Sequence, residues 1–304
     1  MTTLPIAITC GDPAGVGPEL IEKWLKSNPT LAKDVVIIGP FSWLEKLPLT
    51  AKQKCGVGEP SYQIRPGIPD LQGSSIALAA MEMAAKGTEE NRFRAVVTGP
   101  INKAAFAKMG YPFPGQTEFF ADRWKGEAVM AFAGGKLTVG LVTRHVALKD
   151  VPQSLNADEI RRTTLALIHL RKKMGDSQPR IAVCGLNPHA GENGLLGRED
   201  EAIIRPVVES LRQEGHSVTG PLSADTIFYR HLQGEFDAVV AMYHDQGLTA
   251  LKTIDFSTAA NLSLGLKFIR TSPDHGTGYE IAGREKAEIG SLTSAIKLAH
   301  LLSS

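Results

Sequence analysis

The sequence has few cysteines, no long apolar run and almost no net charge. Its three cysteines among 304 residues, Cys10, Cys55 and Cys184, are widely spaced and lack the C-x-x-C spacing of a zinc or redox site. We therefore expect reduced thiols, with Cys10 and Cys184 in strands, in a cytoplasmic protein. No segment approaches the roughly 20 apolar residues of a membrane-spanning helix, and the N-terminus lacks the basic region of a signal peptide.

The balance of charge excludes a protein that attracts nucleic acid or an anionic membrane through its overall field. Lysine and arginine together number 33, against 32 acidic residues. Apolar residues make up 43% and charged residues 21%, which is typical of an ordinary globular protein. The length suits two domains or one large domain.

Three motifs that would assign a function directly are also absent. The early glycines Gly11, Gly15 and Gly17 do not match G-x-G-x-x-G, and the sequence has no G-K-[ST], so neither a dinucleotide fingerprint nor a P-loop is present. We interpret this segment as a tight loop between a strand and a helix that begins near Pro18. No G-x-S-x-G occurs either, which leaves nucleophilic hydrolysis with little support.

The sequence does contain short apolar runs that alternate with longer segments of helical period. The runs are rich in Val and Ile and end in Gly, Pro or polar residues, which is typical of buried strands in a largely parallel sheet. They occupy residues 5–9, 34–40, 94–100, 180–186 and 237–243. The predicted fold class is α/β. Ligands in open α/β sheets bind beyond the carboxyl ends of the strands, so the residues that follow these runs are candidates for a site.

Two central segments can be predicted in more detail. Asn156 precedes a helical segment that stops at Gly175, with Glu159 in the position of a capping-box partner. Residues 128–143 predict a hairpin whose turn, Gly134-Gly135, suits positive φ. An antiparallel hairpin within a parallel scheme indicates a second subdomain.

Seven of the eight histidines divide by their positions. His169, His216, His231 and His300 lie in helical or turn segments and are interpreted as structural. The three that follow strands are His145, His189 and His244. Three imidazoles suit a borderline-soft divalent ion and leave positions open for substrate oxygens, although the spacings match no local zinc pattern and three unrelated loop histidines are the alternative.

Other polar residues lie near these histidines or follow later in the chain. Glu192 and Asp245 could orient the imidazoles. Lys252, Asn261 and Arg270 supply cationic and amide groups. An arginine after an apolar run can bind a carboxylate or phosphate through two hydrogen bonds, or it can be a solvated residue at a strand end.

Taken together, the motifs resemble those of one family, the 4-hydroxythreonine-4-phosphate dehydrogenases of vitamin B6 (pyridoxine) biosynthesis. The matching segments run in the family's order from residue 11 to 283. They are GDPAGVGPE, TGPINK, TEFF, GLNPHAGENGLLGRED, GPLSADTIF, AMYHDQGLTALK, NLSLGL and IRTSPDHGTGYEIAG.

The resemblance implies a two-domain isopropylmalate-dehydrogenase-like fold with mostly parallel sheets and an active-site cleft between the domains. A domain of residues 1–120 and 250–304 would bind NAD. The central domain, residues 121–249, would carry the metal ligands and the dimer contacts. The family also implies a homodimer with shared active sites, in which the partner subunit supplies one of the three metal-ligand histidines.

The implied reaction is the oxidation of 4-hydroxythreonine 4-phosphate at its C3 hydroxyl, followed by decarboxylation to 3-amino-2-oxopropyl phosphate. It would use NAD (or NADP) and one divalent metal per site, zinc, magnesium or cobalt. The implied metal ligands are His145, His189 and His244. The implied substrate contacts are Gln116, Thr117, Lys252, Asn261 and Arg270. The implied cofactor contacts are His275, Gly276 and Thr277, and the candidate proton acceptors are Asp245 and Lys252.

One position departs from the family pattern. Gln116 stands where the family usually has histidine, and an amide cannot become cationic near neutral pH, so it would hold an anionic group more weakly. The same chemistry on threonate or erythronate 4-phosphate, or on a cis-dihydrodiol, in a catabolic pathway is therefore the alternative. A metal-dependent hydrolase is a more remote one.

Overall fold

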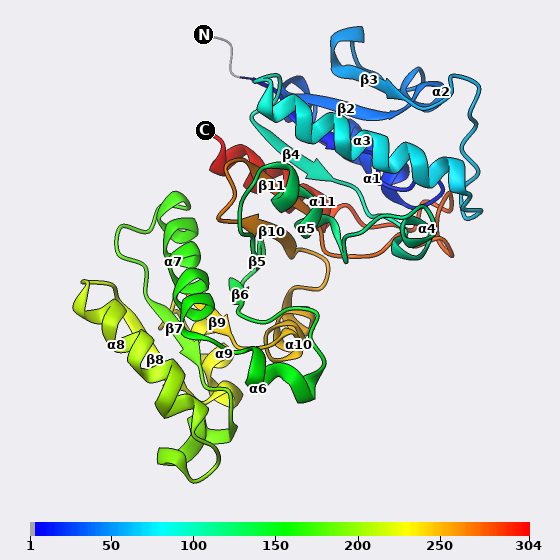
Figure 1. Cartoon of the computed structure of the whole chain (residues 1–304). Helices are drawn as coiled ribbons and strands as arrows, with labels where there is room; N and C mark the ends of the chain where they lie inside the picture. Colours follow the sequence, from blue (N-terminus) through cyan, green and yellow to red (C-terminus); the bar gives the residue numbers. More distant parts are fainter. Residues whose placement is uncertain (1–3) are drawn as a thin grey trace. The chain divides into compact units, whose positions relative to one another are not determined.

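The computed structural model describes residues 4–304 and divides the chain into two compact units. Unit 1 contains the described residues up to Ala128 together with Leu266–Ser304, and unit 2 is Val129–Gly265. The blue and red ends of the colour scale in Figure 1 therefore belong to the same unit. Residues 1–3, the start of the N-terminal segment discussed above, lie outside the described residues.

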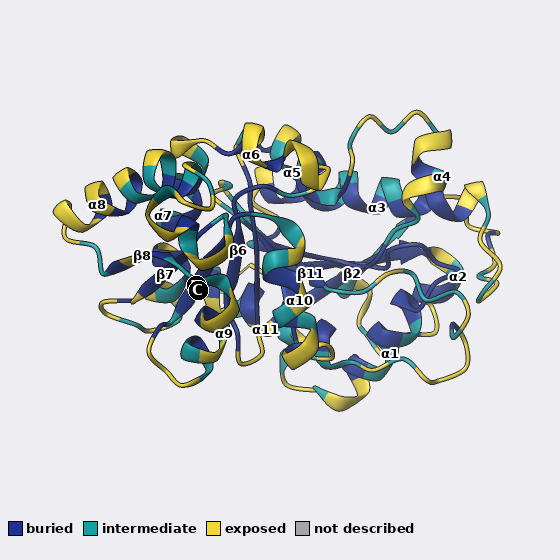
Figure 2. Cartoon of the chain, turned by 90° about the horizontal axis from the view of Figure 1, so that it is seen from below, coloured by how far each residue is buried: buried dark blue, intermediate teal, exposed yellow. Residues whose placement is uncertain are grey.

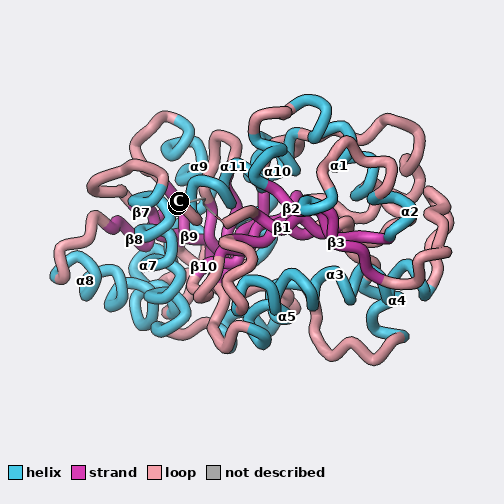
Figure 3. The backbone as a smooth tube through the Cα atoms, turned by 90° about the horizontal axis from the view of Figure 1, so that it is seen from above, coloured by secondary structure: helices cyan, strands magenta, loops and turns pink. Residues whose placement is uncertain are grey.

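Unit 1 is built on a parallel sheet with the strand order β3-β2-β1-β4-β11. Helices cover both faces, with α1 on one side of the strands and α3 on the other (Figure 2, Figure 3). Its strands are β1 (Ile6–Thr9), β2 (Val35–Pro40), β3 (Lys54–Val57), β4 (Ala95–Thr98) and β11 (Ile269–Pro273). Its helices are α1 (Gly17–Ser27), α2 (Phe41–Leu44), α3 (Leu71–Glu89), α4 (Lys103–Lys108), α5 (Gln116–Arg123) and α11 (Gly290–Leu302).

Unit 2 is built on a mixed sheet with the strand order β10-β5-β6-β9-β7-β8. The pairs β10–β5 and β5–β6 are antiparallel, and the others are parallel. Its strands are β5 (Val129–Ala133), β6 (Val139–Leu141), β7 (Ile181–Cys184), β8 (Val218–Leu222), β9 (Ala238–Ala241) and β10 (Ala260–Leu264). Its helices are α6 (Val151–Ser154), α7 (Ala157–Lys173), α8 (Arg205–Gln213), α9 (Ala224–Leu232) and α10 (His244–Asp255). Among the residues described, no helix is long and apolar enough to cross a membrane.

The boundaries of the units lie later in the chain than the expected crossings near residues 121 and 249. The helix α10 packs on β6 and β9, and β10 pairs with β5, so both elements belong to unit 2. Apolar residues of the hairpin, β9 and α10 share one buried cluster, which includes Phe132, Leu141 and Leu251. This packing holds α10 against β9, which it follows in the chain after two residues.

The five predicted strands are confirmed, each within a residue or two at its ends. All of their residues in regular strand structure are buried, as expected for strands covered on both faces. Cys10 is the exception to the expected cysteine positions, because β1 ends at Thr9 and Cys10 is the next residue. All three cysteines are free thiols.

The predicted hairpin and helix are confirmed, with two corrections. Gly134 has φ +106°, but Gly135 does not have positive φ; a Cβ at Gly135 would lie 2.2 Å from the Asp255 carboxyl carbon, so close packing explains this glycine. The side chain of Asn156 caps α7 by accepting a hydrogen bond from the Glu159 N–H at 2.9 Å. The Glu159 carboxylate pairs with Arg162 instead of returning to the cap.

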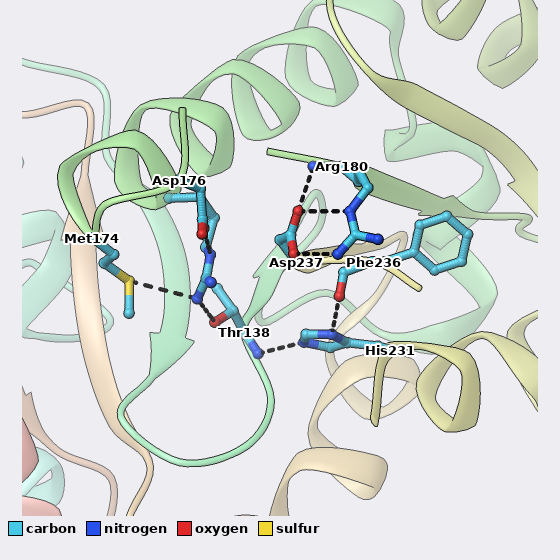
Figure 4. Close-up of polar contacts among 8 residues, drawn as sticks. Thr138, Met174, Asp176, Arg180, His231, Phe236 and Asp237 are labelled. Atoms are coloured by element: carbon cyan, nitrogen blue, oxygen red, sulfur yellow. Dashed lines mark hydrogen bonds and ion pairs between the residues drawn. The ribbon is translucent and has the colours of Figure 1, made fainter. Parts of the chain in front are cut away.

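His231 is a structural residue, as predicted. It is 7% exposed, and both ring nitrogens are hydrogen-bonded (Figure 4): Nε2 accepts from the Thr138 N–H at 3.0 Å, and Nδ1 donates to the Phe236 carbonyl at 2.8 Å. This arrangement requires the neutral ring. Burial lowers the pKa of His231, and the nearby Arg171 guanidinium also lowers it, while the bond to Phe236 opposes them.

We expect His231 to make unfolding pH-dependent. Its folded-state pKa lies below the value of about 6.5 in an unfolded chain, so the unfolded chain takes up the proton first as the pH falls. The stabilisation is complete above about pH 6.5 and is lost as the pH falls below it. The urea midpoint should therefore drop more between about pH 8 and pH 5.5 in the wild type than in His231→Gln. The same drop in both proteins would contradict this role.

Candidate active site

Two of the predicted metal ligands lie together in unit 2. His145 follows β6, and His244 is the first residue of α10, which begins after the two residues that follow β9. The strands β6 and β9 are parallel neighbours with Leu141 opposite Ala241, so their carboxyl ends meet at one edge of the sheet. The ring centroids of His145 and His244 are 5.6 Å apart.

The tautomer of His244 is set by its neighbour. The distance from Nδ1 of His244 to a carboxylate oxygen of Asp245 is 2.7 Å, so Nδ1 carries a proton, and in the neutral tautomer Nε2 is the nitrogen with the free lone pair. Asp245 is therefore in contact with the His244 ring, and its role in orienting that ring stays a prediction. A cavity of about 250 Å³ adjoins this pair, and it is lined by Arg144, His145, Val146, Leu148, Val151, Tyr243, His244 and Asp245.

The third predicted ligand is not brought into this pair within one chain. His189 is exposed on the loop Pro188–Gly194 with φ +52°, and Glu192 is exposed on the same loop with φ +44°. Throughout residues 4–304, no three side chains of His, Cys, Asp or Glu are grouped so that they could hold a metal ion. The structure does not bring Glu192 into contact with an imidazole of the described chain.

Two of the predicted substrate contacts meet in unit 1. Arg270 lies on β11 and is 3% exposed; its Nη2 donates to Thr98 Oγ1 at 2.6 Å and to Gln116 Oε1 at 3.2 Å. The Gln116 amide in turn donates to the Gly99 carbonyl at 3.0 Å. Arg270 is therefore not a solvated residue at a strand end.

Arg270 is cationic at neutral pH although it is buried. Burial disfavours the charged form of the side chain. It lowers the pKa of the guanidinium to about 10, while the charge of Glu118 acts in the opposite direction. The group therefore stays cationic at neutral pH. Thr117 is buried next to Gln116 in the first turn of α5. A buried guanidinium whose printed hydrogen bonds go to the neutral side chains of Thr98 and Gln116 suits an anionic ligand, although the Glu118 charge also acts on it.

The other two predicted substrate contacts belong to unit 2. Lys252 lies on α10, with its Nζ 5.9 Å from the centroid of the Phe256 ring. Asn261 lies on β10 and is 9% exposed, opposite Phe132 of β5.

The predicted cofactor contacts occupy the loop between β11 and α11. The Thr277 carbonyl accepts a hydrogen bond from the Val16 N–H at 2.8 Å, which attaches this loop to the one after β1. His275 Nδ1 is 3.0 Å from the Gly276 carbonyl, whereas Nε2 is shielded from solvent and has no hydrogen-bond partner in the described chain. A cavity of about 400 Å³ in unit 1 includes Gly283 and Glu285 of the following segment in its lining.

Sequence reasoning missed two residues that hold this loop. The Tyr279 hydroxyl donates to Oδ2 of Asp12 at 2.9 Å, and Asp12 is only 1% exposed. Burial raises the pKa of Tyr279 to about 12, and the charge of Asp12 adds to the effect, so the hydroxyl remains a donor at neutral pH. Both residues stand inside quoted motifs, GDPAGVGPE and HGTGYEIAG, but nothing in either motif indicates that they touch.

Comparison with known proteins agrees with the motifs. The model of the family "Pyridoxal phosphate biosynthetic protein PdxA" matches residues 27–299. A 4-hydroxythreonine-4-phosphate dehydrogenase of Thioalkalivibrio sulfidiphilus is 43% identical over 323 residues, which cover 98% of this chain and 97% of that protein. A crystal structure of 4-hydroxythreonine-4-phosphate dehydrogenase from Klebsiella pneumoniae has a TM-score of 0.84 at 35% identity, covering 99% and 100% of the two chains.

More distant structures define the wider fold. A terephthalate 1,2-cis-dihydrodiol dehydrogenase from Burkholderia xenovorans has a TM-score of 0.71 at 27% identity, covering 99% of this chain and 98% of that one. An isocitrate dehydrogenase from Methylococcus capsulatus has a TM-score of 0.50 at 13% identity. The match covers 98% of this chain and 85% of that chain, and it shows a shared fold. The predicted α/β fold class is confirmed. The chain belongs to the family of the pyridoxal phosphate biosynthetic protein PdxA.

Proposed function

We propose that the chain oxidises 4-hydroxythreonine 4-phosphate at its C3 hydroxyl, with loss of carbon dioxide to give 3-amino-2-oxopropyl phosphate, in pyridoxal phosphate biosynthesis. It is an oxidoreductase, a 4-hydroxythreonine-4-phosphate dehydrogenase, like the relatives that match it along nearly their whole length. The observation that carries the proposal is the imidazole pair at the carboxyl ends of β6 and β9. The three cysteines of the chain are free thiols, and free thiols are typical of a reducing compartment, so they support a cytoplasmic location.

The imidazole pair has the donor chemistry of a divalent metal site. Neutral imidazole is a good ligand for zinc and cobalt, and the carboxylate on Nδ1 of His244 leaves Nε2 as the donor atom. We propose that His145 and His244 hold one metal ion, zinc, magnesium or cobalt. When bound, the metal would act as a Lewis acid on the carbinol oxygen, and a nicotinamide cofactor would accept the hydride from C3. Asp245 and Lys252 remain the candidates for the proton acceptor.

His189 would reach this pair from a second copy of the chain. It is exposed, and within residues 4–304 of one chain no group of three ligands forms. The apolar Leu195 is 81% exposed just beyond the His189 loop, and Leu148 is 70% exposed just beyond His145. Exposed apolar side chains next to a site suit a protein interface. We therefore propose a homodimer in which the sites are shared.

The phosphate would bind at Arg270. The guanidinium is buried and cationic, and its hydrogen bonds to Thr98 and Gln116 fix its plane. A planar guanidinium can bind phosphate through two parallel hydrogen bonds. Gln116 is neutral, so the positive charge in this cluster comes from Arg270. Thr117, Lys252 and Asn261 are proposed as further substrate contacts by their match to the family motif.

The loop after β11 is proposed to hold the nicotinamide cofactor, NAD or NADP, through His275, Gly276 and Thr277. The supporting observation is the shielded Nε2 of His275, which has no partner among the described residues. A buried polar atom of this kind is costly unless a ligand completes its hydrogen bond. We therefore expect the cofactor to bind at Nε2 of His275. The loop that carries this atom is held to the rest of unit 1 by the hydrogen bond between Val16 and Thr277.

Loss of the Tyr279 hydroxyl is expected to weaken cofactor binding and to leave the turnover rate nearly unchanged. Tyr279→Phe removes the bond to Asp12 that fastens the loop, so the KM for NAD should rise about 5-fold while kcat changes little. Steady-state kinetics with NAD as the varied substrate measure both constants. Tyr229→Phe, at a side chain that is 66% exposed, is the matched control. A fall in kcat with an unchanged KM would contradict this role.

A second candidate function keeps the chemistry and changes the substrate. Gln116 in place of the family histidine weakens the case for the amino-acid phosphate, and one similar structure is that of a terephthalate 1,2-cis-dihydrodiol dehydrogenase. The alternatives are threonate or erythronate 4-phosphate and cis-dihydrodiols. Arg270 suits the phosphate esters, because a planar guanidinium can bind a phosphate through two parallel hydrogen bonds and a diol without an anionic group offers no such contact.

The proposed function predicts equal amounts of NADH and carbon dioxide from 4-hydroxythreonine 4-phosphate. The assay contains the purified chain, NAD and a divalent metal, with NADH followed by its absorbance and carbon dioxide trapped in parallel. Reduction of NAD without release of carbon dioxide would refute the decarboxylation step. Consumption of substrate without any NADH would refute the dehydrogenase and favour a metal-dependent hydrolase.

A further inference from the structure

The carboxylate of Asp200 is fully buried at the base of the His189 loop. Asp200 is 0% exposed and is the first residue of a π-helical turn, Asp200–Ile204. Its Oδ1 accepts a hydrogen bond from the Leu186 N–H at 2.7 Å, and its Oδ2 accepts from the Asn187 N–H at 3.2 Å and the Asn187 side chain at 2.9 Å. A carboxylate is buried at this depth only where such donors are arranged around it.

The loop that Asp200 holds has an unusual backbone. Residues His189 to Asn193 all have positive φ between 44° and 75°, and four of these five are not glycine. Side chains other than glycine rarely adopt this region, so the conformation persists only where surrounding contacts impose it. A carboxylate that binds the two residues before the turn is such a contact.

Close packing shows that the turn folds back over Asp200. A Cβ at Gly185 would lie 2.6 Å from both the Ala190 Cα and Oδ1 of Asp200. Gln246 of α10 links this edge to the segment before His244. Its amide donates to the Gly185 carbonyl at 2.8 Å, and its oxygen accepts from the Met242 N–H at 2.7 Å. Asp200 and Gln246 therefore connect the ends of β7 and β9, the strands that precede His189 and His244.

We propose that Asp200 is a positioning residue for the metal site: it holds the left-handed turn that presents His189 to the partner subunit. This inference rests on the proposed function, in which His189 is a metal ligand. Asp200 contributes no ligand itself. Its carboxylate fixes the peptide groups of Leu186 and Asn187, and these fix where the turn begins.

The test compares zinc affinity in Asp200→Asn and in the wild type, by competition with a chromogenic chelator. The amide turns one acceptor oxygen into a donor that faces an N–H group, so zinc affinity should fall about 10- to 100-fold, the range found for residues that orient metal ligands. Asp237→Asn is the matched control. Asp237 accepts hydrogen bonds from the Arg180 N–H and guanidinium elsewhere in unit 2, so its loss should lower stability and leave zinc affinity unchanged.

A second variant keeps the inference testable if Asp200→Asn does not fold. Asn187→Ala removes the side-chain hydrogen bonds to Asp200 and Glu199 and leaves the carboxylate in place, so zinc affinity should fall about 10-fold. Wild-type affinity in either folded Asp200→Asn or Asn187→Ala would overturn the role of Asp200 while leaving the metal site intact. Failure of the wild-type chain to bind zinc would overturn both the role and the proposed metal site.

Discussion

His244→Ala is expected to lower kcat/KM for metal-dependent NAD reduction by about 1,000-fold, because the loss of a ligand removes several kcal/mol of Lewis-acid stabilisation. The ring centroids of His145 and His244 are 5.6 Å apart, and the variant keeps only His145 of this pair. The measurement is the initial rate of NADH formation over a range of zinc concentrations.

The matched control for His244→Ala is His169→Ala. His169 is an exposed residue of α7 in the same unit, so its replacement should leave kcat/KM unchanged. A His244→Ala variant that retained its activity at low zinc would contradict the shared metal site. Activity that returned only at high zinc would agree with a weakened site, in which His145 still binds the metal.

Arg270→Lys is expected to raise the KM for the phosphorylated substrate about 100-fold. The guanidinium donates to Thr98 through both Nε and Nη2, and an ammonium cannot reproduce this planar arrangement or bind phosphate through two parallel hydrogen bonds. The loss of one charge-assisted bond, about 1.5–3 kcal/mol, accounts for the size of the effect, since the ammonium keeps the charge. Steady-state kinetics with the substrate varied give the result.

Arg180→Lys is the control for Arg270→Lys. Arg180 also uses its guanidinium to bind an acidic group, Asp237, but it is in unit 2 and is not one of the proposed substrate contacts, so the KM should not change. Thermal unfolding of both variants separates a loss of binding from a loss of structure. An unchanged KM in folded Arg270→Lys would place the phosphate elsewhere.

The local features of the fold could be predicted because local signals specify them. The strands were bounded by Gly, Pro or polar residues, and Asn156 marked the start of α7. The meeting of His145 and His244 also followed from local reasoning, since both residues come after strands and parallel strands present their carboxyl ends at one edge.

Features that depend on distant pairing could not be predicted. The strand β10 belongs to unit 2 because Ala260 pairs with Ala133, and nothing near residue 260 encodes that partner. The burial of Arg270 follows from the pairing of β11 with β4, which brings it to the Thr98 hydroxyl. Buried carboxylates such as Asp200 look like surface residues in the sequence, since charged residues usually are.

The most direct test of the proposed substrate is kcat/KM measured side by side for 4-hydroxythreonine 4-phosphate and for threonate and erythronate 4-phosphates, with NAD and a divalent metal. The proposed function predicts the highest value for the amino-acid phosphate, with Gln116 as a tolerated variation at a site where Arg270 supplies the charge. A higher kcat/KM for either sugar-acid phosphate would contradict a role in pyridoxal phosphate biosynthesis and assign the enzyme to a catabolic reaction.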